Sequence, residues 1–399
     1  MEDKKKNSIS DVSRNLSEPE WLLRFREKHL EISATLPVTE KYGLGIAGIP
    51  AEAEHSLEGT AEYFVDASRG VEIYTWKEAV TQEEIAPYLE RLLQSELFPA
   101  PKTKPDALSL AHFRSGIVLY AQPHMEEDGT FREEKLTLTT TLSAGSAADV
   151  VIVIVKEGAK LSLQNMCTGG VTGGLFARTI VLLVEGDAQV RVSEREEMKN
   201  GMMLKVRARA LVSAHGSAAW KALSLSSASV ARHTDALLIG EGASTEIIDG
   251  MIAKENAFFD ISASAIHLAS STYSRIHSAG LGFDSSKTVY RGLIDMKSGV
   301  SAVDGAQEGR FITASRTAKI DAIPSLDIAS KDVRCVHKLS ITHVRDEDIF
   351  YPKLRGLSDT ESRMLFLEGS FADIFPEEEN EAIMEDIRKT LAAHNLARP

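Results

Sequence analysis

A repeated turn within a long β-rich segment is the sequence feature that most restricts how this chain can fold. Between residues 109 and 328, runs of Val, Ile, Leu and Ala alternate with short turns that contain glycine. The turns recur at intervals of roughly 26–30 residues, with one or more skipped before the last, which is a spacing typical of stacked repeats. They are Glu157-Gly158-Ala159, Gly186-Asp187-Ala188, His215-Gly216-Ser217-Ala218, Glu241-Gly242-Ala243 and Ser298-Gly299-Val300.

This repeat favours a β-solenoid over other β-rich folds. A single coil cannot bury its apolar face alone, whereas stacked coils share one continuous core. Strand-like runs such as residues 150–154 and 180–183 supply the inward Val, Ile and Leu side chains that such a core needs. A β-sandwich or a barrel would contain similar strands, so the residues by themselves leave those folds open.

Helical patterns precede the β-rich segment. Residues 1–15 are polar and charged, and we expect a disordered tail there. Two stretches match the capping-box pattern, and an apolar helical stripe follows each of them. They are Ser17-Glu18-Pro19-Glu20 and Thr81-Gln82-Glu83-Glu84. The proline-rich stretch at 99–105 ends the second stripe. We therefore expect a helical or mixed segment over residues 1–108.

Helical patterns return after the β-rich segment. Ser358-Asp359-Thr360-Glu361 is a third capping box, followed by apolar residues on one helical face. A last acidic helix is expected after Pro376, and we expect these two helices to cap the end of the solenoid. The resulting division is a β-helix core over residues 109–330, with the last strands and a helical domain over residues 331–399.

Charge and cysteine content exclude several functions. The net charge of −13 would repel a phosphate backbone, and no dense basic run occurs beyond Lys4-Lys5-Lys6, so nucleic acid is not an expected partner. Two cysteines cannot form a disulfide framework or a structural zinc site within one chain. The longest apolar run, residues 150–155, is far shorter than a membrane span, and the N-terminus lacks an apolar export signal. We expect a cytoplasmic protein without a membrane partner.

Cys335 and His337 form the one pair with plausible metal-ligand chemistry. They lie two residues apart in a strand-like stretch, and side chains with that spacing share one face of a strand. Thiolate suits iron–sulfur species, and imidazole suits iron. Core packing is the alternative for both residues. For Cys167 we expect a buried, unreactive thiol, and the glycines at 169–174 lack the Gly-Lys-Ser/Thr of a phosphate loop.

The stretch around this pair resembles the C-terminal part of the SufB/SufD family of iron–sulfur cluster assembly scaffold proteins. Similar segments also occur upstream: one looks like the family's Gly-Leu-Ile strand, one like the Asp-Gly turn after it, and one like its entry helix. The matching residues are Cys335-x-His337, Phe350-Tyr351, Arg355-Gly356-Leu357, Tyr290-Arg291-Gly292-Leu293-Ile294, Asp304-Gly305 and Glu18 to Arg26.

The resemblance implies a mainly β fold, a right-handed parallel β-helix flanked by helical segments at both ends. It further implies a non-catalytic scaffold subunit, not an enzyme, that helps to build and transfer nascent iron–sulfur clusters. His337 matches a histidine at which the family is thought to hold the cluster between two subunits, and Cys335 matches a cysteine of the SufD branch. The cluster would be transient and shared with a partner subunit.

The SufB branch has a further cysteine before the position of Pro324, and this chain has none between Cys167 and Cys335. The chain is therefore SufD-like, and a partner would have to supply thiolates. The resemblance implies a SufB-type subunit, or a second copy of this chain, paired edge to edge through the β-helix. It also implies a SufC-type ABC ATPase docked on the C-terminal helices, and an indirect link to a cysteine desulfurase system.

A solenoid enzyme acting on a polysaccharide is the alternative from a different class. Such an enzyme would use a pair of carboxylates and carbohydrate-facing aromatic residues. Aromatic residues make up only 6% of this chain, and no carboxylate pair stands out in the sequence. These observations favour the scaffold.

Overall fold

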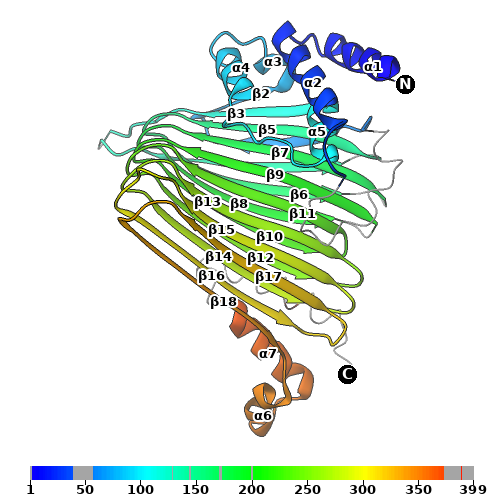
Figure 1. The fold of residues 1–399 in the computed structure, drawn as a ribbon, viewed down its shortest axis with the longest axis vertical. Helices are drawn as coiled ribbons and strands as arrows, with labels where there is room; N and C mark the ends of the chain where they lie inside the picture. Colours follow the sequence, from blue (N-terminus) through cyan, green and yellow to red (C-terminus); the bar gives the residue numbers. More distant parts are fainter. Residues whose placement is uncertain are drawn as a thin grey trace.

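The computed structural model describes residues 2–38, 57–127, 129–142, 145–169, 173–198, 201–372 and 388. Two nine-stranded sheets face each other and form one long β-helix, as Figure 1 shows. From β3 onward, successive strands alternate between the two sheets, and each strand pairs in parallel with its neighbour one coil away. The predicted fold class, a parallel β-helix with helical segments at both ends, is confirmed.

The first sheet runs in the order β1-β4-β6-β8-β10-β12-β14-β16-β18. Its strands are β1 Ala61–Ala67, β4 Glu133–Leu142, β6 Lys160–Gly169, β8 Gln189–Met198, β10 Ser217–Ser226, β12 Ser244–Ala253, β14 Tyr273–Gly282, β16 Val303–Thr313 and β18 Val333–His343. The second sheet runs in the order β17-β15-β13-β11-β9-β7-β5-β3-β2. Its strands are β2 Val71–Thr75, β3 Ser115–Ala121, β5 Ala147–Val155, β7 Gly174–Val184, β9 Met202–Val212, β11 Ser229–Leu238, β13 Phe258–His267, β15 Lys287–Met296 and β17 Lys319–Ile328.

The repeated turns stack at one corner of the solenoid, each with one residue in the left-handed backbone region. That residue is Gly158 (φ 72°), Asp187 (φ 57°), His215 (φ 56°), Gly242 (φ 72°) or Gly299 (φ 84°). Glycine, and less often Asp or His, adopts this conformation. Backbone hydrogen bonds join successive corners, as from the N–H of Gly158 to the carbonyl of Gly186. The sequence repeat is therefore the repeat of a backbone conformation.

One face of each sheet points into a shared apolar interior. Alternate residues of a strand pack there, as Ile247 and Met251 of β12 do. The intervening residues Ile248 and Ile252 belong to a separate cluster on the outer face of the same strand. The interior is continuous along the solenoid, as expected when stacked coils share their core.

The N-terminal segments differ from the expectation in two respects. Residues 2–15 form helix α1 (Glu2–Asn15) with Ile9 and Val12 buried, so the prediction of a disordered tail is wrong. Apolar burial at these two positions stabilises the helix despite its charged composition. Helix α2 (Glu20–Ser33) begins after Pro19, whose side chain cannot accept a hydrogen bond, so the capping box predicted for Ser17 and Glu20 is wrong. Glu18 pairs with the buried Arg26.

The second predicted capping box is also wrong. Helix α4 (Ala86–Gln94) follows Ile85 without a side-chain cap. Capping boxes form instead between Thr75 and Glu78, at helix α3 (Trp76–Ala79), and between Thr103 and Asp106, at helix α5 (Lys104–His112). Helices α2, α4 and α5 pack against the outer face of the second sheet through an apolar cluster that includes Leu22, Leu89 and Val150.

The C-terminal helices lie at the β18 end of the solenoid in Figure 1. Helix α6 (Asp346–Leu354) was not predicted, whereas the capping box of helix α7 (Asp359–Ala372) is confirmed: Ser358 Oγ accepts from the N–H of Glu361, and Ser358 donates to its carboxylate. Leu367 of α7 belongs to the outer apolar cluster of the first sheet. In the described residues α6 and α7 leave the edges of β17 and β18 open, so the capping expected from the two C-terminal helices stays a prediction. The acidic helix predicted after Pro376 lies outside the described residues.

Candidate functional site

Strand β18 is the last strand of the first sheet and pairs on one side only, with β16. The second sheet ends in the same way with β17, which pairs with β15 alone. It contains Pro324, and proline is tolerated in an edge strand. Among the described residues, the solenoid therefore ends in two open strand edges. Apolar side chains on both are 42–52% exposed: Ile323, Ile328, Val336 and Ile341. An open edge with exposed apolar residues is a surface for pairing with another chain.

Cys335 and His337 lie in the middle of this edge strand. Cys335 is opposite Gly305 of β16, and His337 is opposite Gln307. Cys335 is half-buried and packs against the interior with its neighbours Val333 and Leu339, whereas His337 is exposed. The structure thus places both candidate ligands on the last coil, with the imidazole open to a neighbouring molecule.

Burial, together with the nearby Asp304 carboxylate, raises the pKa of the Cys335 thiol. A thiol with a raised pKa is a poor thiolate ligand in the isolated chain and requires a cation beside it to ionise. Arg334 and Lys338 of the same strand are exposed and pair with acids of β16, at 4.0 Å from Asp304 and 3.3 Å from Glu308. The local environment of Cys335 therefore favours the thiol over the thiolate.

No group of three or more His, Cys, Asp or Glu in the described residues is arranged to hold a metal ion. One thiol and one imidazole fall short of the usual ligand set of an iron–sulfur cluster. A cluster held here as cargo needs ligands from a second chain, and the open edge is where such a chain can approach. Cys167 is 2% exposed, so the expectation of a buried thiol is confirmed, and burial raises its pKa to about 12.

The structure agrees with some interpretations of the residues that carry the family resemblance and contradicts another. Tyr290 to Ile294 lies in β15, as its strand pattern predicts. Asp304-Gly305 lies inside β16 and forms no turn, so that interpretation is wrong. A Cβ atom at Gly305 would come within 2.8 Å of Met296 Cε, which explains a glycine in mid-strand. Phe350 and Tyr351 are exposed on helix α6.

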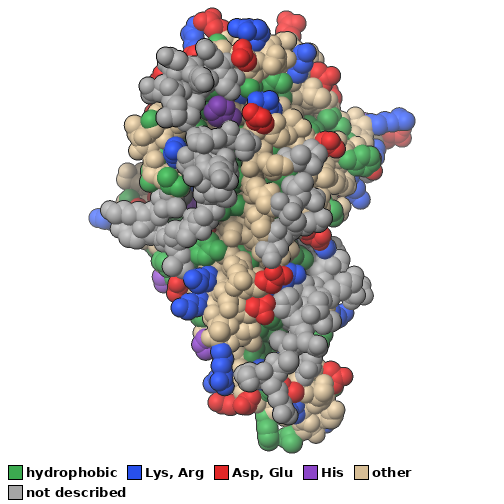
Figure 2. All heavy atoms as spheres, turned by 90° about the vertical axis from the view of Figure 1, so that its right-hand side faces the viewer, with side chains coloured by type: hydrophobic (Ala, Val, Ile, Leu, Met, Phe, Trp, Pro, Cys, Tyr) green, Lys and Arg blue, Asp and Glu red, His purple; other side chains and the backbone are tan. Residues whose placement is uncertain are grey.

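Sequence reasoning expected a partner on the C-terminal helices but missed helix α6, which forms much of the exposed apolar surface there. Phe350, Tyr351 and Leu354 of α6 and Leu365 of α7 are 50–67% exposed. In Figure 2 a group of hydrophobic side chains occupies the lower tip of the molecule, at the level where Figure 1 places α6. The signal was the spacing of Phe350 and Leu354, four residues apart, which puts both on one side of a helix. Patches of this kind mark interaction sites.

The described residues thus form a parallel β-helix that ends in open strand edges, and one of these edge strands carries Cys335 and His337. Residues 138–370, more than half of the chain, match the sequence model of the SufBD core domain of the SUF system for FeS cluster assembly. The chain belongs to the SufBD family of iron–sulfur cluster assembly proteins, as the resemblance of its motifs implies.

Curated relatives carry the name "Iron-sulfur cluster assembly SufBD family protein". One from Staphylococcus saprophyticus is 23% identical over 93% of this chain and 89% of its own length. Others from Staphylococcus epidermidis and Staphylococcus aureus are 22% and 23% identical over the same shares. The similarity therefore spans nearly the whole chain. In the described part of the chain, no helix has the length and apolar character needed to cross a membrane.

Proposed function

We propose that this chain is a non-catalytic, SufD-like scaffold subunit of the cytoplasmic SUF complex. In this proposal a SufB-type subunit, or a second copy of the chain, pairs with the open edges of β17 and β18. The nascent cluster is cargo, held between the two subunits by His337 and Cys335 together with thiolates of the partner. A cysteine desulfurase system supplies sulfur indirectly.

The observation that carries the proposal is the open edge strand β18, which bears both candidate ligands. An unpaired strand edge offers a full row of backbone donors and acceptors to a second strand. Pairing there would bring the partner's side chains beside the exposed His337 and would cover Val336 and Ile341. The position of the ligands and the position of the free edge thus coincide.

We further propose that a SufC-type ATPase docks on the C-terminal helices. Support comes from the exposed apolar side chains of α6, which the solenoid does not cover. Helix α7 is anchored to the first sheet by Leu367, which is 0% exposed, so α6 is presented by a fixed neighbour. Apolar side chains presented by such a helix are suited to a groove on another protein.

The test of the scaffold role is reconstitution with purified SufB-type and SufC-type partners. The full complex, charged with iron and sulfide, is expected to develop the visible absorption of an iron–sulfur cluster and to pass the cluster to an apo-acceptor. The double variant Val336→Lys, Ile341→Lys is expected to weaken association with the SufB-type subunit at least tenfold, because two apolar contacts are lost.

Ile73→Lys is the matched control, because Ile73 is an equally exposed apolar residue (40%) on β2, at the other end of the solenoid. Its complex is expected to assemble like the wild type. A complex that forms cluster equally well when this chain is omitted would refute the scaffold role. Normal association of the β18 double variant would place the subunit interface elsewhere.

A further inference from the structure

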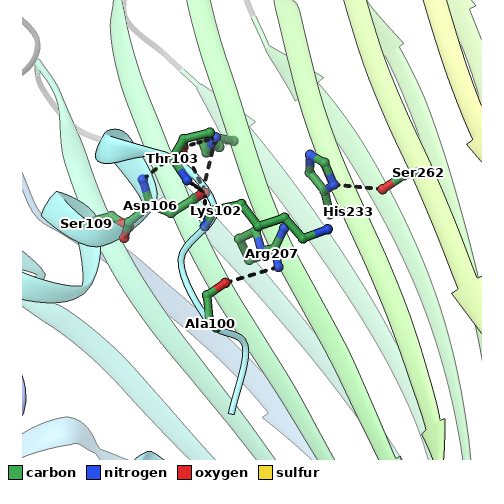
Figure 3. Close-up of polar contacts among 9 residues, drawn as sticks. Ala100, Lys102, Thr103, Asp106, Ser109, Arg207, His233 and Ser262 are labelled. Carbon is green, nitrogen blue, oxygen red and sulfur yellow. Dashed lines mark hydrogen bonds and ion pairs between the residues drawn. The ribbon is translucent and has the colours of Figure 1, made fainter. Parts of the chain in front are cut away.

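A group of basic side chains lies on the outer face of the second sheet, beneath residues 99–103. Lys205 and Arg207 come from β9, His233 comes from β11, and Lys102 comes from the loop that crosses above them. Lys205, Arg207 and His233 are 4–6% exposed, whereas Lys102 is exposed. Figure 3 shows the Lys102 side chain extended over the strands towards His233, with Arg207 beside it.

The guanidinium of Arg207 does not have hydrogen-bond partners for all of its nitrogens. Its Nη2 donates to the Ala100 carbonyl at 3.4 Å, and its buried Nη1 has no hydrogen-bond partner. The buried guanidiniums of Arg178 and Arg232 also have one nitrogen each without a hydrogen-bond partner, but both of them pair with carboxylates. Arg207 differs because no carboxylate lies within ion-pair distance of it, and a guanidinium, which is always charged, has N–H donors left for an anionic acceptor.

The charges around Arg207 do not balance. Asp106 pairs with Lys205 at 3.1 Å, and Asp235 pairs with Arg209 at 2.8 Å. In the described part of the chain, no carboxylate lies within ion-pair distance of Arg207 or of Lys102, although the charges of Asp235 and Asp106 act on Arg207 from farther away. These two carboxylates face four cations: Lys102, Lys205, Arg207 and Arg209. This local excess stands within a chain whose net charge is −13.

The same group of positive charges affects the pKa of His233. Burial and the neighbouring Arg207 and Lys205 hold the pKa of His233 well below its usual value, with Asp106 opposing the shift. The ring is fixed by a 2.7 Å hydrogen bond between Nδ1 and Ser262 Oγ. A neutral imidazole between buried cations is consistent with a locally positive potential.

We propose that these residues form a binding site for a tetrahedral oxyanion, phosphate as the free ion or as the head of a phosphate monoester. Arg207 Nη1 would donate from the sheet below, and Lys102 Nζ would donate from the loop above. Donors from two levels suit a tetrahedral anion better than a planar carboxylate, and Arg and Lys are the common phosphate ligands. The exposed Lys102 marks the side from which the anion enters. This site is separate from the open edge and does not depend on the proposed function.

Calorimetric titration of the full chain tests the proposal. Inorganic phosphate and glycerol phosphate are titrated separately, at an ionic strength held constant with NaCl, to distinguish the free ion from the ester. We expect saturable binding of one phosphate per chain to the wild type. Lys102→Gln, an exposed substitution, is expected to weaken binding roughly tenfold, because a charge-assisted hydrogen bond is lost. Arg207→Gln is expected to abolish binding.

The control is Arg191→Gln, which removes an exposed positive charge from the first sheet and should leave binding unchanged. Lys102→Gln decides the matter if Arg207→Gln fails to fold. Wild-type protein that shows no saturable phosphate binding would overturn the proposal, since water alone would then satisfy Arg207. Equal affinity in Lys102→Gln and wild type, or acetate binding as tight as phosphate binding, would overturn it as well.

Discussion

Arg232 of β11 crosses the interior of the solenoid, and its Nη1 donates to Glu194 Oε2 of β8 at 2.8 Å. The two residues belong to opposite sheets, and their side chains are 1% and 2% exposed. Arg232 also pairs with Glu196, and Trp220 Nε1 donates to Glu194 at 2.7 Å. A buried ionic network therefore connects the two sheets inside a mainly apolar core, as the buried Arg178–Asp149 pair with Thr140 does nearer the N-terminal end.

The first prediction is that Arg232→Met lowers the free energy of unfolding by about 3–5 kcal/mol, because two buried carboxylates lose their cation. Chemical denaturation of the full chain measures this change. Arg191→Gln is the control, since it breaks an exposed ion pair and should cost about 0–1 kcal/mol. Equal stability of the two variants would show that the interior carboxylates become neutral without the arginine.

The second prediction concerns Asp249, which is 2% exposed. Burial raises its pKa to about 7, opposed by Arg232 and reinforced by Glu196 and Glu194. The unfolded chain has a pKa of about 3.9 at this residue. The folded state therefore binds the extra proton, and the stability that this provides is complete below about pH 4 and lost as the pH rises through about 7.

Asp249→Asn, which stays neutral, is thus expected to melt like the wild type near pH 4 and about 2 °C or more above it at pH 8. Asp321→Asn, at an exposed site on β17, is the control and should show no such divergence. Parallel melting curves of Asp249→Asn and wild type from pH 4 to pH 8 would contradict the raised pKa.

The β-helix could be predicted because each coil repeats the same local sequence pattern. Turn residues such as Gly158 and Gly242 recur at the left-handed corner of each coil, and aliphatic runs fill the strands between them. The alternation of side chains along a strand also indicates which residues of β8 face the interior. Val190 and Val192 point inward, and so do Glu194 and Glu196. The burial of these two carboxylates depends on partners from other strands, above all Arg232, 38 residues away from Glu194, which the sequence alone does not place beside them.

The candidate site was less fully predictable. Spacing placed Cys335 and His337 on one strand, but a sequence does not show that this strand is the last of its sheet. Their different exposure depends on packing by β16 and on neighbouring Leu339. Helix α6 was missed because its short apolar pattern contains Pro352, which reads as a helix breaker, and because the helix buries little.

The third prediction is that a maleimide labels Cys335 but not Cys167 in the folded chain. Cys335 is half-buried at the open edge, whereas Cys167 is inside the solenoid. The thiolate is the reactive form, and the raised pKa of Cys335 means that its labelling should accelerate as the pH rises above about 8.5. Mass spectrometry of the labelled protein gives the site. Labelling of Cys167 at a comparable rate would mean that the interior opens; denaturant provides the positive control.

The fourth prediction concerns docking on helix α6. Phe350→Asp with Leu354→Asp is expected to weaken binding of the SufC-type ATPase at least tenfold without lowering the melting temperature, since both side chains are more than 60% exposed. Phe64→Asp, at a 70% exposed site on β1, is the matched control. These point variants are preferable to removing residues 358–399, because that deletion also removes the buried Leu367. Unchanged ATPase binding by the double variant would place the docking surface elsewhere.

The last prediction separates ligation from packing at His337. An exposed imidazole on an edge strand contributes little to the core, so His337→Ala should melt within about 1 °C of the wild type. If the imidazole holds iron, the complex with the SufB-type and SufC-type partners should lose most of its cluster absorption, because one ligand of a shared shell is missing. His124→Ala, at another exposed histidine, controls for loss of an imidazole as such.

Cys335→Ser provides the comparison on the same strand. Its thiol packs against the interior and has a raised pKa, so we expect a milder loss of cluster and a small loss of stability. Visible absorption and melting temperature are read on the same samples of the wild type, His337→Ala, Cys335→Ser and His124→Ala. If His337→Ala assembles cluster at the wild-type level, the imidazole is not a ligand, and the open edge serves only to bind the partner subunit.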